Sequence, residues 1–345
     1  MPYLTDMFHE QNRTVNTVTR DAVAQRLRSR VIGQDPAIDA VMRALVLARA
    51  GAHDPSRPLA NLLLVGPTGV GKTELVRRLA AELRSGPDDL CRIDMNSLAQ
   101  EHYAASFSGA PPGYAGSKEA FTLFDRTTVE GDPYTPGIVL FDEVEKAHPT
   151  VLRALLQVLD SGMLRLASGQ QTISFRNSYV FLTSNLGSAE LARRRGSGWR
   201  RALDRVVPLD RVTGRLTTRG TKSAVDKALR GFFDPEFLNR IDETVQFSEL
   251  DRPACARITA LEVELLIGRM RRRSVSVEVS EQVVALLAER GFDPVYGARG
   301  LRRVLRTELA VPVAEEVARH RTDADTPLTV TVALRNGQVH ATSSA

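Results

Sequence analysis

Apolar residues along the chain follow two spacings, one typical of buried strands and one typical of amphipathic helices. Continuous apolar runs that predict buried strands lie at residues 61–65, 91–94, 138–141, 178–183 and 243–247. Helical spacing occurs between and before them, as at residues 35–49, where Ile38, Val41 and Leu45 share one face. Strands that alternate with helices predict an α/β fold with a doubly wound, parallel five-stranded sheet.

The pattern changes after Asp251-Arg252-Pro253. From there the spacing predicts helices at about 253–272, 280–290, 299–306 and 309–320, with short strands at 276–279, 328–334 and 338–342. We therefore expect a large domain at residues 21–250 and a smaller, mostly helical C-terminal domain carrying short strands at residues 251–345. Residues 1–20 are polar and predict a loose N-terminal arm.

One loop predicts a nucleotide site. The run Gly66-Pro67-Thr68-Gly69-Val70-Gly71-Lys72-Thr73 fits the phosphate-loop pattern G-x-x-x-x-G-K-[ST] and lies between an apolar strand and a helical pattern. In such a loop backbone N–H groups surround the phosphates, the lysine reaches the β and γ phosphates, and the threonine hydroxyl holds Mg²⁺. The following helix directs its positive N-terminus at the same anion. We predict that this loop binds ATP with Mg²⁺.

A pair of acids about 70 residues later completes the predicted chemistry. Residues 138–141 lead directly into Asp142 and Glu143. A parallel strand would deliver Asp142 beside the Mg²⁺ and Glu143 beside the attacking water, as its base. Acids after a buried strand also suit the start of a helix, and only the phosphate loop upstream favours catalysis.

Three further polar residues extend the candidate site. Asn185 follows the strand at 178–183, where it can hold the lytic water or the γ-phosphate, although an Asn at a strand end is ordinarily a turn residue. Arg240 precedes the last strand and can stabilise transition-state charge on a neighbouring subunit's nucleotide. Arg299 begins a C-terminal helix and can reach the phosphates when the domains close.

Composition and charge narrow the class of protein. A chain of 345 residues that is 43% hydrophobic and 25% charged is typical of globular proteins, and no run of 18 apolar residues predicts a membrane span. Cys91 and Cys255 have no metal-binding spacing, which indicates reduced thiols and a cytoplasmic protein.

Residues 193–222 form a basic insertion with ten basic and two acidic residues. It is either a solvated loop or a docking segment for an acidic partner or nucleic acid.

Six motifs in this order resemble the Clp-type AAA+ protein unfoldases, specifically the second, C-terminal ATPase module of the two-ring Clp proteins. They are Val31-Ile32-Gly33-Gln34, the phosphate loop, the segment from Asp142 to Pro149, Thr183-Ser184-Asn185, Asn239-Arg240-Ile241-Asp242 and Tyr296-Gly297-Ala298-Arg299. The resemblance runs from about residue 24 to near the end of the chain. It implies an AAA+ module that works as a homo-hexameric ring, either as a free-standing single ring or as a fragment of a longer protein.

The resemblance also implies roles for individual residues. Val31 and Ile32 would line the adenine pocket. Lys72 and Thr73 would hold phosphate and Mg²⁺, with Asp142 as the second Mg²⁺ residue and Glu143 as the catalytic base. Asn185 would be the first sensor, Arg240 the finger that acts on a neighbouring subunit, and Arg299 the second sensor.

A Gly/Pro-rich loop at residues 109–116 carries the aromatic that, in the family, grips polypeptide in a central pore. Here that aromatic is Tyr114, followed by Ala115 where the family commonly has valine, and the second pore loop at 169–175 lacks the family's arginine and aspartate. Ser197-Gly198-Trp199 lies where protease-feeding members carry an apolar-Gly-apolar loop. Ser197 does not suit an apolar docking pocket, so a ClpP-type protease partner is not favoured.

The leading hypothesis is therefore an ATP-hydrolysing motor that remodels protein substrates. The second is a nucleic-acid-remodelling ATPase that uses the basic insertion. The third is a nucleotide-gated scaffold with little turnover, against which the intact pair of Asp142 and Glu143 argues, because a scaffold needs no catalytic base.

Overall fold

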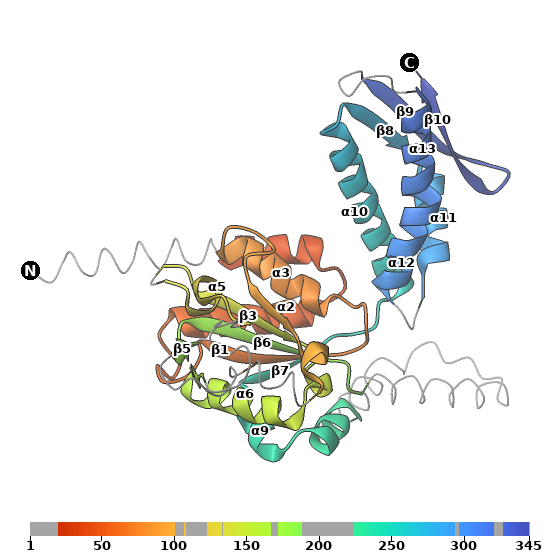
Figure 1. Ribbon diagram of the computed structural model, residues 1–345. Coiled ribbons are helices and arrows are strands. Elements are labelled where there is room, and N and C mark those ends of the chain that lie inside the picture. The colour runs from red at the N-terminus through yellow and green to blue at the C-terminus, as the bar shows by residue number, and fades with distance from the viewer. Residues whose placement is uncertain are drawn as a thin grey trace, which may run out of the picture. The chain divides into compact units, whose positions relative to one another are not determined.

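The computed structural model describes residues 20–100, 107, 123–132, 134–166, 172–187, 224–293, 297–320 and 327–344. The chain forms two compact units (Figure 1). The first comprises Met1–Gly66 and Gly71–Phe247, and the second comprises Ser248–Ala345 together with the tip of the phosphate loop, Pro67–Val70.

The first unit is built on a five-stranded sheet in the order β2-β3-β6-β1-β7, in which every neighbouring pair is parallel. The strands are β1 (Ala60–Val65), β2 (Cys91–Asp94), β3 (Gly137–Asp142), β6 (Ser178–Ser184) and β7 (Glu243–Gln246). Each lies within one residue of the predicted bounds at either end, and the predicted parallel five-stranded sheet is confirmed. Every residue of β1, β3 and β6 is buried, as expected for a parallel sheet covered on both faces.

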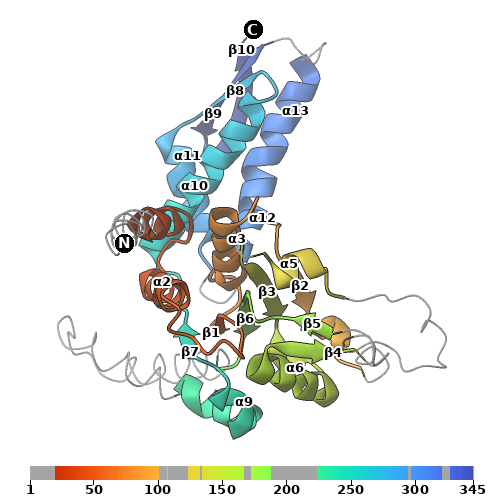
Figure 2. The same cartoon turned by 90° about the vertical axis from the view of Figure 1, so that its left-hand side faces the viewer.

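Helices cover the two faces of this sheet. They are a helix at residues 20–30, α2 (Asp35–Arg49), α3 (Lys72–Leu83), α5 (Arg126–Glu130), α6 (Pro149–Ser161), a helix at 224–232 and α9 (Pro235–Asn239), with short 3₁₀ turns at Met95–Leu98 and Val144–Lys146. In two perpendicular views α2 and α3 lie on one face and α6 and α9 on the other (Figures 1 and 2). The sheet is therefore doubly wound, as predicted.

Helix α6 begins and ends at residues whose local chemistry favours those points. Pro149 stands at its first position, and the His148 side chain accepts a hydrogen bond from the Thr150 amide. Gly162 ends the helix in the left-handed conformation. Its apolar face packs against alternate residues of the sheet in one core cluster, which includes Leu155, Val158, Leu63, Val139 and Leu182.

A two-stranded antiparallel hairpin follows α6, formed by β4 (Met163–Arg165) and β5 (Thr172–Ser174). The sequence analysis predicted no strands here and assigned residues 169–175 to a loop. Strands of three residues are too short to establish a period of two, and their pairing depends on a partner outside the local window. Residues 167–171 lie outside the described part of the chain.

The second unit joins a helical layer to a three-stranded sheet. Its elements are α10 (Arg252–Arg271), β8 (Val275–Val279), α11 (Glu281–Gly291), α12 (Ala298–Leu305), a π-helical turn at Arg306–Ala310, α13 (Val311–His320), β9 (Leu328–Arg335) and β10 (Gln338–Ser344). The sheet order is β10-β9-β8, with β9 parallel to β8 and antiparallel to β10. The mostly helical composition with short strands is as predicted.

Local signals explain the boundaries in this unit. Asp251 and Ser280 cap α10 and α11 by accepting hydrogen bonds from the amides of Ala254 and Val283. Asn336 and Gly337, both with positive φ, turn β9 into β10, which is the residue pair that a tight hairpin favours. Among the described residues of the whole chain, no helix combines the length and the apolar character needed to cross a membrane.

Candidate active site

The phosphate loop connects β1 to α3 through backbone conformations that only glycine adopts readily. Gly66, Gly69 and Gly71 have φ of 150°, 77° and 106°. A Cβ on Gly66 would lie 2.7 Å from the carbonyl oxygen of Phe247, so a larger residue there would force the loop from its place. Alternation of right- and left-handed residues turns successive backbone N–H groups toward one concave side, which is a general anion-binding arrangement.

Lys72 is the first residue of α3 and is only 7% exposed. Its ammonium donates hydrogen bonds to the Gly66 carbonyl oxygen at 2.6 Å and to the Asn185 Oδ1 at 2.9 Å. A buried cation needs such partners. These two contacts hold the positive charge between the phosphate loop and the end of β6.

Asp142 ends β3 and is 8% exposed. The Thr183 hydroxyl donates to its Oδ1 at 2.5 Å, and the Arg92 guanidinium donates to its Oδ2 at 2.6 Å. The Thr73 hydroxyl lies 3.4 Å from both carboxylate oxygens. Hydroxyl and carboxylate oxygens are ligand types that Mg²⁺ prefers, so the donor set formed by Thr73 and Asp142 fits that ion.

Glu143 adopts a left-handed backbone conformation, with φ 60°, which is uncommon for any residue with a Cβ. Its amide donates a hydrogen bond to the Thr183 hydroxyl at 2.9 Å. Its carboxylate Oε1 accepts one from the Asn185 Nδ2 at 3.2 Å. Thr183 and Asn185 therefore fix the backbone and the side chain of Glu143 from the neighbouring strand.

The sheet brings these side chains together. β1, β3 and β6 are adjacent and parallel, with Val65 opposite Ser184 and Phe141 opposite Leu182. Their carboxyl ends therefore meet at one edge, where ligands bind in folds of this kind. Asn185 bridges the site, because its side chain contacts both Lys72 and Glu143. The arrangement can bind a polyphosphate and deprotonate a water molecule beside it.

Val31 and Ile32 are buried in the first unit. Val31 flanks the phosphate loop, since a methyl group placed on Gly71 would lie 3.7 Å from its Cγ1. This position is compatible with contact to a nucleotide held by the loop. Their role at the adenine base stays a prediction.

Arg240 lies at the opposite end of β1 from the phosphate loop. Its carbonyl oxygen accepts a hydrogen bond from the Asn61 side chain at 3.1 Å, and Asn61 is the second residue of β1. The five residue-to-residue steps from Asn61 to Gly66 span about 16 Å along a strand. Arg240 therefore does not join the cluster of Lys72, Asp142 and Glu143 in its own subunit. Its guanidinium instead pairs with Asp160 at 2.7 Å.

Several predicted residues have no tested role. Arg299 is the second residue of α12 in the second unit and is exposed, and its function as a sensor stays a prediction. Tyr114 and Ala115 of the first pore loop, Trp199, and the basic insertion at 193–222 lie outside the described residues. The predictions made for them stay open.

The sequence analysis missed three residues of the hydrogen-bond network around the acids. Arg92 pairs with Asp142, Thr183 contacts both Asp142 and the Glu143 amide, and the Glu145 carboxylate accepts a hydrogen bond from the Asn185 amide at 2.9 Å. Thr183 and Glu145 stand inside motifs that the sequence analysis identified, so their position beside predicted site residues could have indicated them. Arg92 stands on a neighbouring strand and has no local signature.

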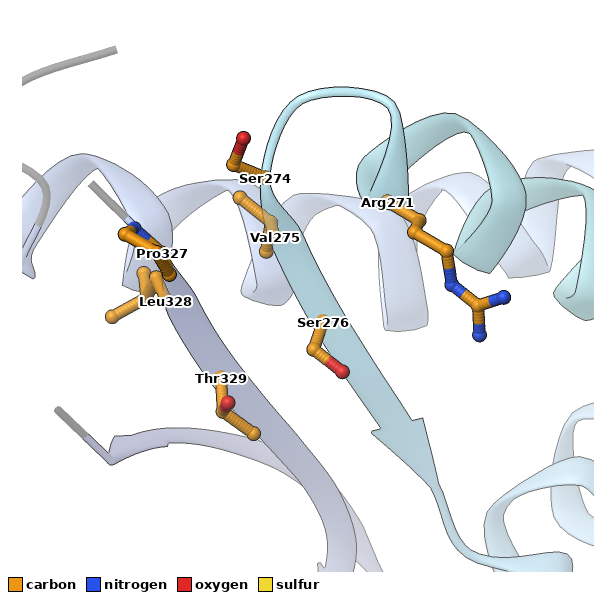
Figure 3. A pocket seen from close by; sticks show the side chains of 7 residues that line it. All are labelled: Arg271, Ser274, Val275, Ser276, Pro327, Leu328 and Thr329. Carbon is orange, nitrogen blue, oxygen red and sulfur yellow. The ribbon is translucent and has the colours of Figure 1, made fainter. Parts of the chain in front are cut away.

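A separate cavity of about 340 Å³ lies in the second unit (Figure 3). Arg271 at the end of α10 stands on one side of it, and residues of β8 and β9 stand on the other. Its lining consists of Arg271, Ser274, Val275, Ser276, Pro327, Leu328 and Thr329. Among the described residues that line it there is no carboxylate to act as a base, so it does not duplicate the chemistry of the first unit.

Two family models and several curated proteins are similar to this chain. The AAA domain (Cdc48 subfamily) matches residues 57–244, and the C-terminal, D2-small domain of ClpB protein matches residues 250–330. An ATP-dependent protease ATP-binding subunit-like protein of Rhodococcus erythropolis is 62% identical over 95% of both chains. A similarly named protein of Pseudomonas aeruginosa, AmiB, is 47% identical over 88% of this chain and 81% of its own.

ClpB chaperones are similar over a smaller share of their length. Chaperone protein ClpB of Meiothermus ruber is 43% identical over 84% of this chain but only 32% of its own. The chain thus spans about a third of the length of these chaperones.

The parallel sheet, the phosphate loop and the acid pair at its edge define a P-loop ATPase. Within that class, the chain belongs to the Clp-type AAA+ ATPase family. The resemblance drawn from six sequence motifs is confirmed.

Proposed function

We propose that this ATPase is a hexameric motor that remodels protein substrates by threading polypeptide through a central pore. Relatives named as ClpB chaperones and as an ATP-dependent protease ATP-binding subunit-like protein support proteins as the class of substrate. The observation that carries the proposal is the division of the catalytic groups. The base and the phosphate-binding lysine meet at the carboxyl edge of the sheet, while the candidate finger Arg240 lies about 16 Å away at the other end of β1.

The residues at the carboxyl edge have separate tasks in hydrolysis. The phosphate loop and Lys72 bind the β and γ phosphates. Glu143 accepts the proton of the attacking water, and Asn185 keeps the Glu143 carboxylate and the Lys72 ammonium on either side of the γ-phosphate position. Thr73 and Asp142 would hold Mg²⁺, which when bound neutralises charge on the phosphate oxygens.

Arg240 completes the site of a neighbouring subunit. An arginine supplied in trans stabilises the charge of the transferred phosphoryl group. ATP would then be hydrolysed only between subunits, which makes a ring the working form. Arg299 would report the nucleotide state to the C-terminal domain, and the resulting closure would move Tyr114 along the pore.

The substrate assignment can be tested with a Glu143→Gln variant, which should bind ATP without hydrolysing it and so retain its cargo. Polypeptide and nucleic acid that copurify in ATP from a cytoplasmic lysate are identified. The proposal expects polypeptide that is lost on adding Tyr114→Ala. The matched control is Tyr134→Ala, because Tyr134 is 96% exposed and lies outside the pore-loop segment.

The opposite outcome would favour the second hypothesis. Nucleic acid that persists in the Tyr114→Ala background but disappears when residues 193–222 are deleted would overturn the protein-remodelling proposal. Its salt dependence would then be steep, because phosphate contacts release counterions.

A further inference from the structure

A network of polar side chains surrounds Arg240 at the amino end of the first sheet, and of these side chains only Asp242 belongs to a motif identified in the sequence. Its members are Arg57 in the segment before β1, Asn61 in β1, Asp160 at the end of α6 and Asp242 after Arg240. All lie within the first unit.

Asn61 and Arg57 hold two backbone carbonyl groups at once. The Asn61 Nδ2 donates to the carbonyl oxygens of Leu159 and Arg240 at 2.9 and 3.1 Å. The Arg57 guanidinium donates to the same two oxygens at 3.2 and 2.8 Å. The Leu159 carbonyl belongs to the last turn of α6, where carbonyl groups have no partner within the helix. These side chains therefore cap α6 and fasten the Arg240 backbone to its end.

Asp242 extends the network along the backbone that follows Arg240. Its carboxylate accepts a hydrogen bond from the Asn61 amide at 2.7 Å and pairs with Arg57 at 3.2 Å. Its own amide donates to the Asn61 carbonyl at 2.9 Å. The backbone that follows the Arg240 Cα, from its carbonyl group to Asp242, is thus fixed to β1, which constrains the direction of the Arg240 side chain.

Asn61 is a polar residue at a buried position, and its hydrogen bonds to the two carbonyl groups explain why an asparagine stands there. Asn61 is fully buried, and its Oδ1 has no hydrogen-bond partner among the described residues. An unsatisfied buried oxygen is unfavourable, and an apolar residue would avoid it. The two hydrogen bonds that Nδ2 donates offset this cost.

Asp160 holds the charged end of Arg240. It is the penultimate residue of α6, where a carboxylate meets the negative end of the helix dipole and is unfavourable for the helix itself. Its partner is the Arg240 Nη1 at 2.7 Å. A guanidinium has five N–H donors in a fixed fork, so one edge can remain on Asp160 while the other faces an incoming phosphate.

We propose that Asp160, Asn61 and Arg57 are positioning residues for the Arg240 finger: they hold its backbone and one edge of its guanidinium, so that the other edge meets the neighbouring subunit's ATP. This inference rests on the proposed trans action of Arg240. It adds the residues within the donating subunit on which that action depends.

The first test compares single variants of the full chain. Asp160→Asn should lower kcat about tenfold with little change in KM, because it removes a positioning contact and no substrate contact. Asp160→Glu should restore most of the activity. Asp88→Asn is the matched control, since it breaks a surface pair with Arg77 that is also 2.7 Å long. An unchanged or raised kcat in Asp160→Asn would overturn the proposal.

The second test separates positioning of the finger from general damage to the subunit. Wild-type subunits are mixed with increasing shares of a Glu143→Gln subunit that also carries Asp160→Asn or Asn61→Ala. The turnover of the wild-type subunits should fall further than with Glu143→Gln alone, because only the donated finger differs. Equal turnover in the two mixtures would overturn the proposal, while melting temperatures and nucleotide affinity show that the variants are folded.

A mixture with Glu143→Gln/Arg240→Ala tests the proposed function itself. It should depress the wild-type subunits most strongly, since an arginine finger contributes about 10³-fold or more to turnover. If this mixture behaves as Glu143→Gln alone, the trans action of Arg240 is wrong, and the positioning role falls with it. If Arg240→Ala acts in trans and Asp160→Asn does not, only the positioning role is wrong.

Discussion

The sheets of the two units distribute their polar residues differently. In the first unit β1, β3 and β6 are buried along their whole length, and the polar groups of the site gather at or just beyond their carboxyl ends. In the second unit β8 and β9 alternate between buried and exposed positions, and their polar residues are spread along the strands. The number of covered faces accounts for the difference, because a sheet with one solvated face accepts polar residues at every second position.

This comparison explains why one unit carries the chemistry. Where both faces are covered, polar side chains lie near the strand ends, so those of neighbouring strands are concentrated at the edges of the sheet, and the groups for ATP hydrolysis share the carboxyl edge. Where one face is open, polar groups can be dispersed without cost and need not meet. The following variants test this contrast, in order of decreasing effect.

The largest expected difference is in the loss of ATP turnover when one of two glutamates, one in each unit, is replaced by glutamine. Glu143→Gln should lower ATP turnover by about 10²- to 10⁴-fold, the usual contribution of a general base, while nucleotide binding persists. Glu316→Gln in α13 should leave turnover unchanged, since Glu316 binds the Ser343 amide and hydroxyl and no catalytic group. Steady-state phosphate release measures both. Comparable losses would contradict the assignment of catalysis to the first unit.

Two glycines with positive φ give the next contrast. Gly66→Ala brings a Cβ to 2.7 Å from the Phe247 carbonyl oxygen, so the loop must shift. Losing one or two hydrogen bonds to phosphate, each about 1.5–3 kcal/mol, should weaken ATP binding by about tenfold to 10⁴-fold. In Gly337→Ala the new Cβ meets nothing within 4 Å, so only a backbone penalty of about 1 kcal/mol is expected. Calorimetric titration with ATP and thermal melts distinguish the two.

Adjacent positions within one strand sharpen the comparison further. Leu63→Ala and Leu64→Ala should each destabilise the first unit by about 2–5 kcal/mol, because both faces of β1 are buried. In β9, Val330→Ala should be destabilising, whereas Thr331→Ala on the exposed face should change stability by less than about 0.5 kcal/mol. Hydrogen exchange of the strand amides measures the stability of each unit separately. A small effect at either β1 position would mean that one face of that sheet is loosely packed.

The smallest effect concerns acid stability of the second unit. The Ser343 amide donates to Glu316 and lowers the pKa of its carboxyl below the usual value, against the opposing effect of burial, with further lowering from the Ser343 hydroxyl, His320 and Arg319. A lowered pKa in the folded state means that the ionised carboxylate stabilises the fold above its unfolded pKa. That stabilisation is lost as the pH falls through the lowered folded-state pKa of Glu316. The protection of the β10 amides, measured relative to their intrinsic exchange rate at each pH, should therefore fall with acid in the wild type and less steeply in Glu316→Gln.

The same contrast determines how far the sequence predicts the structure. Strands β1 and β3 were predicted within one residue at either end because continuous burial leaves an unbroken apolar run. The phosphate loop and the acid pair were predicted because their chemistry requires fixed local spacings. The β4–β5 hairpin was missed because three-residue strands carry little periodic signal.

Contacts between distant segments were also beyond the sequence. Arg92 meets Asp142 because β2 pairs with β3 in a register that sets Asp94 opposite Asp142. Asn61 meets Arg240 across about 180 residues of chain through the pairing of β1 with β7. Residue type and local spacing do not determine how β2 aligns with β3 or β1 with β7. These partners could therefore be identified only in the structure.

The left-handed backbone of Glu143 has a consequence for the evolution of this chain. A residue with a Cβ costs about 1 kcal/mol or more in that conformation, which glycine would adopt freely. Replacing Glu143 by glycine should therefore make the domain more heat-resistant while it abolishes turnover. At this position selection for durability and selection for activity oppose one another, and a library screened for thermal survival alone should accumulate inactive variants there.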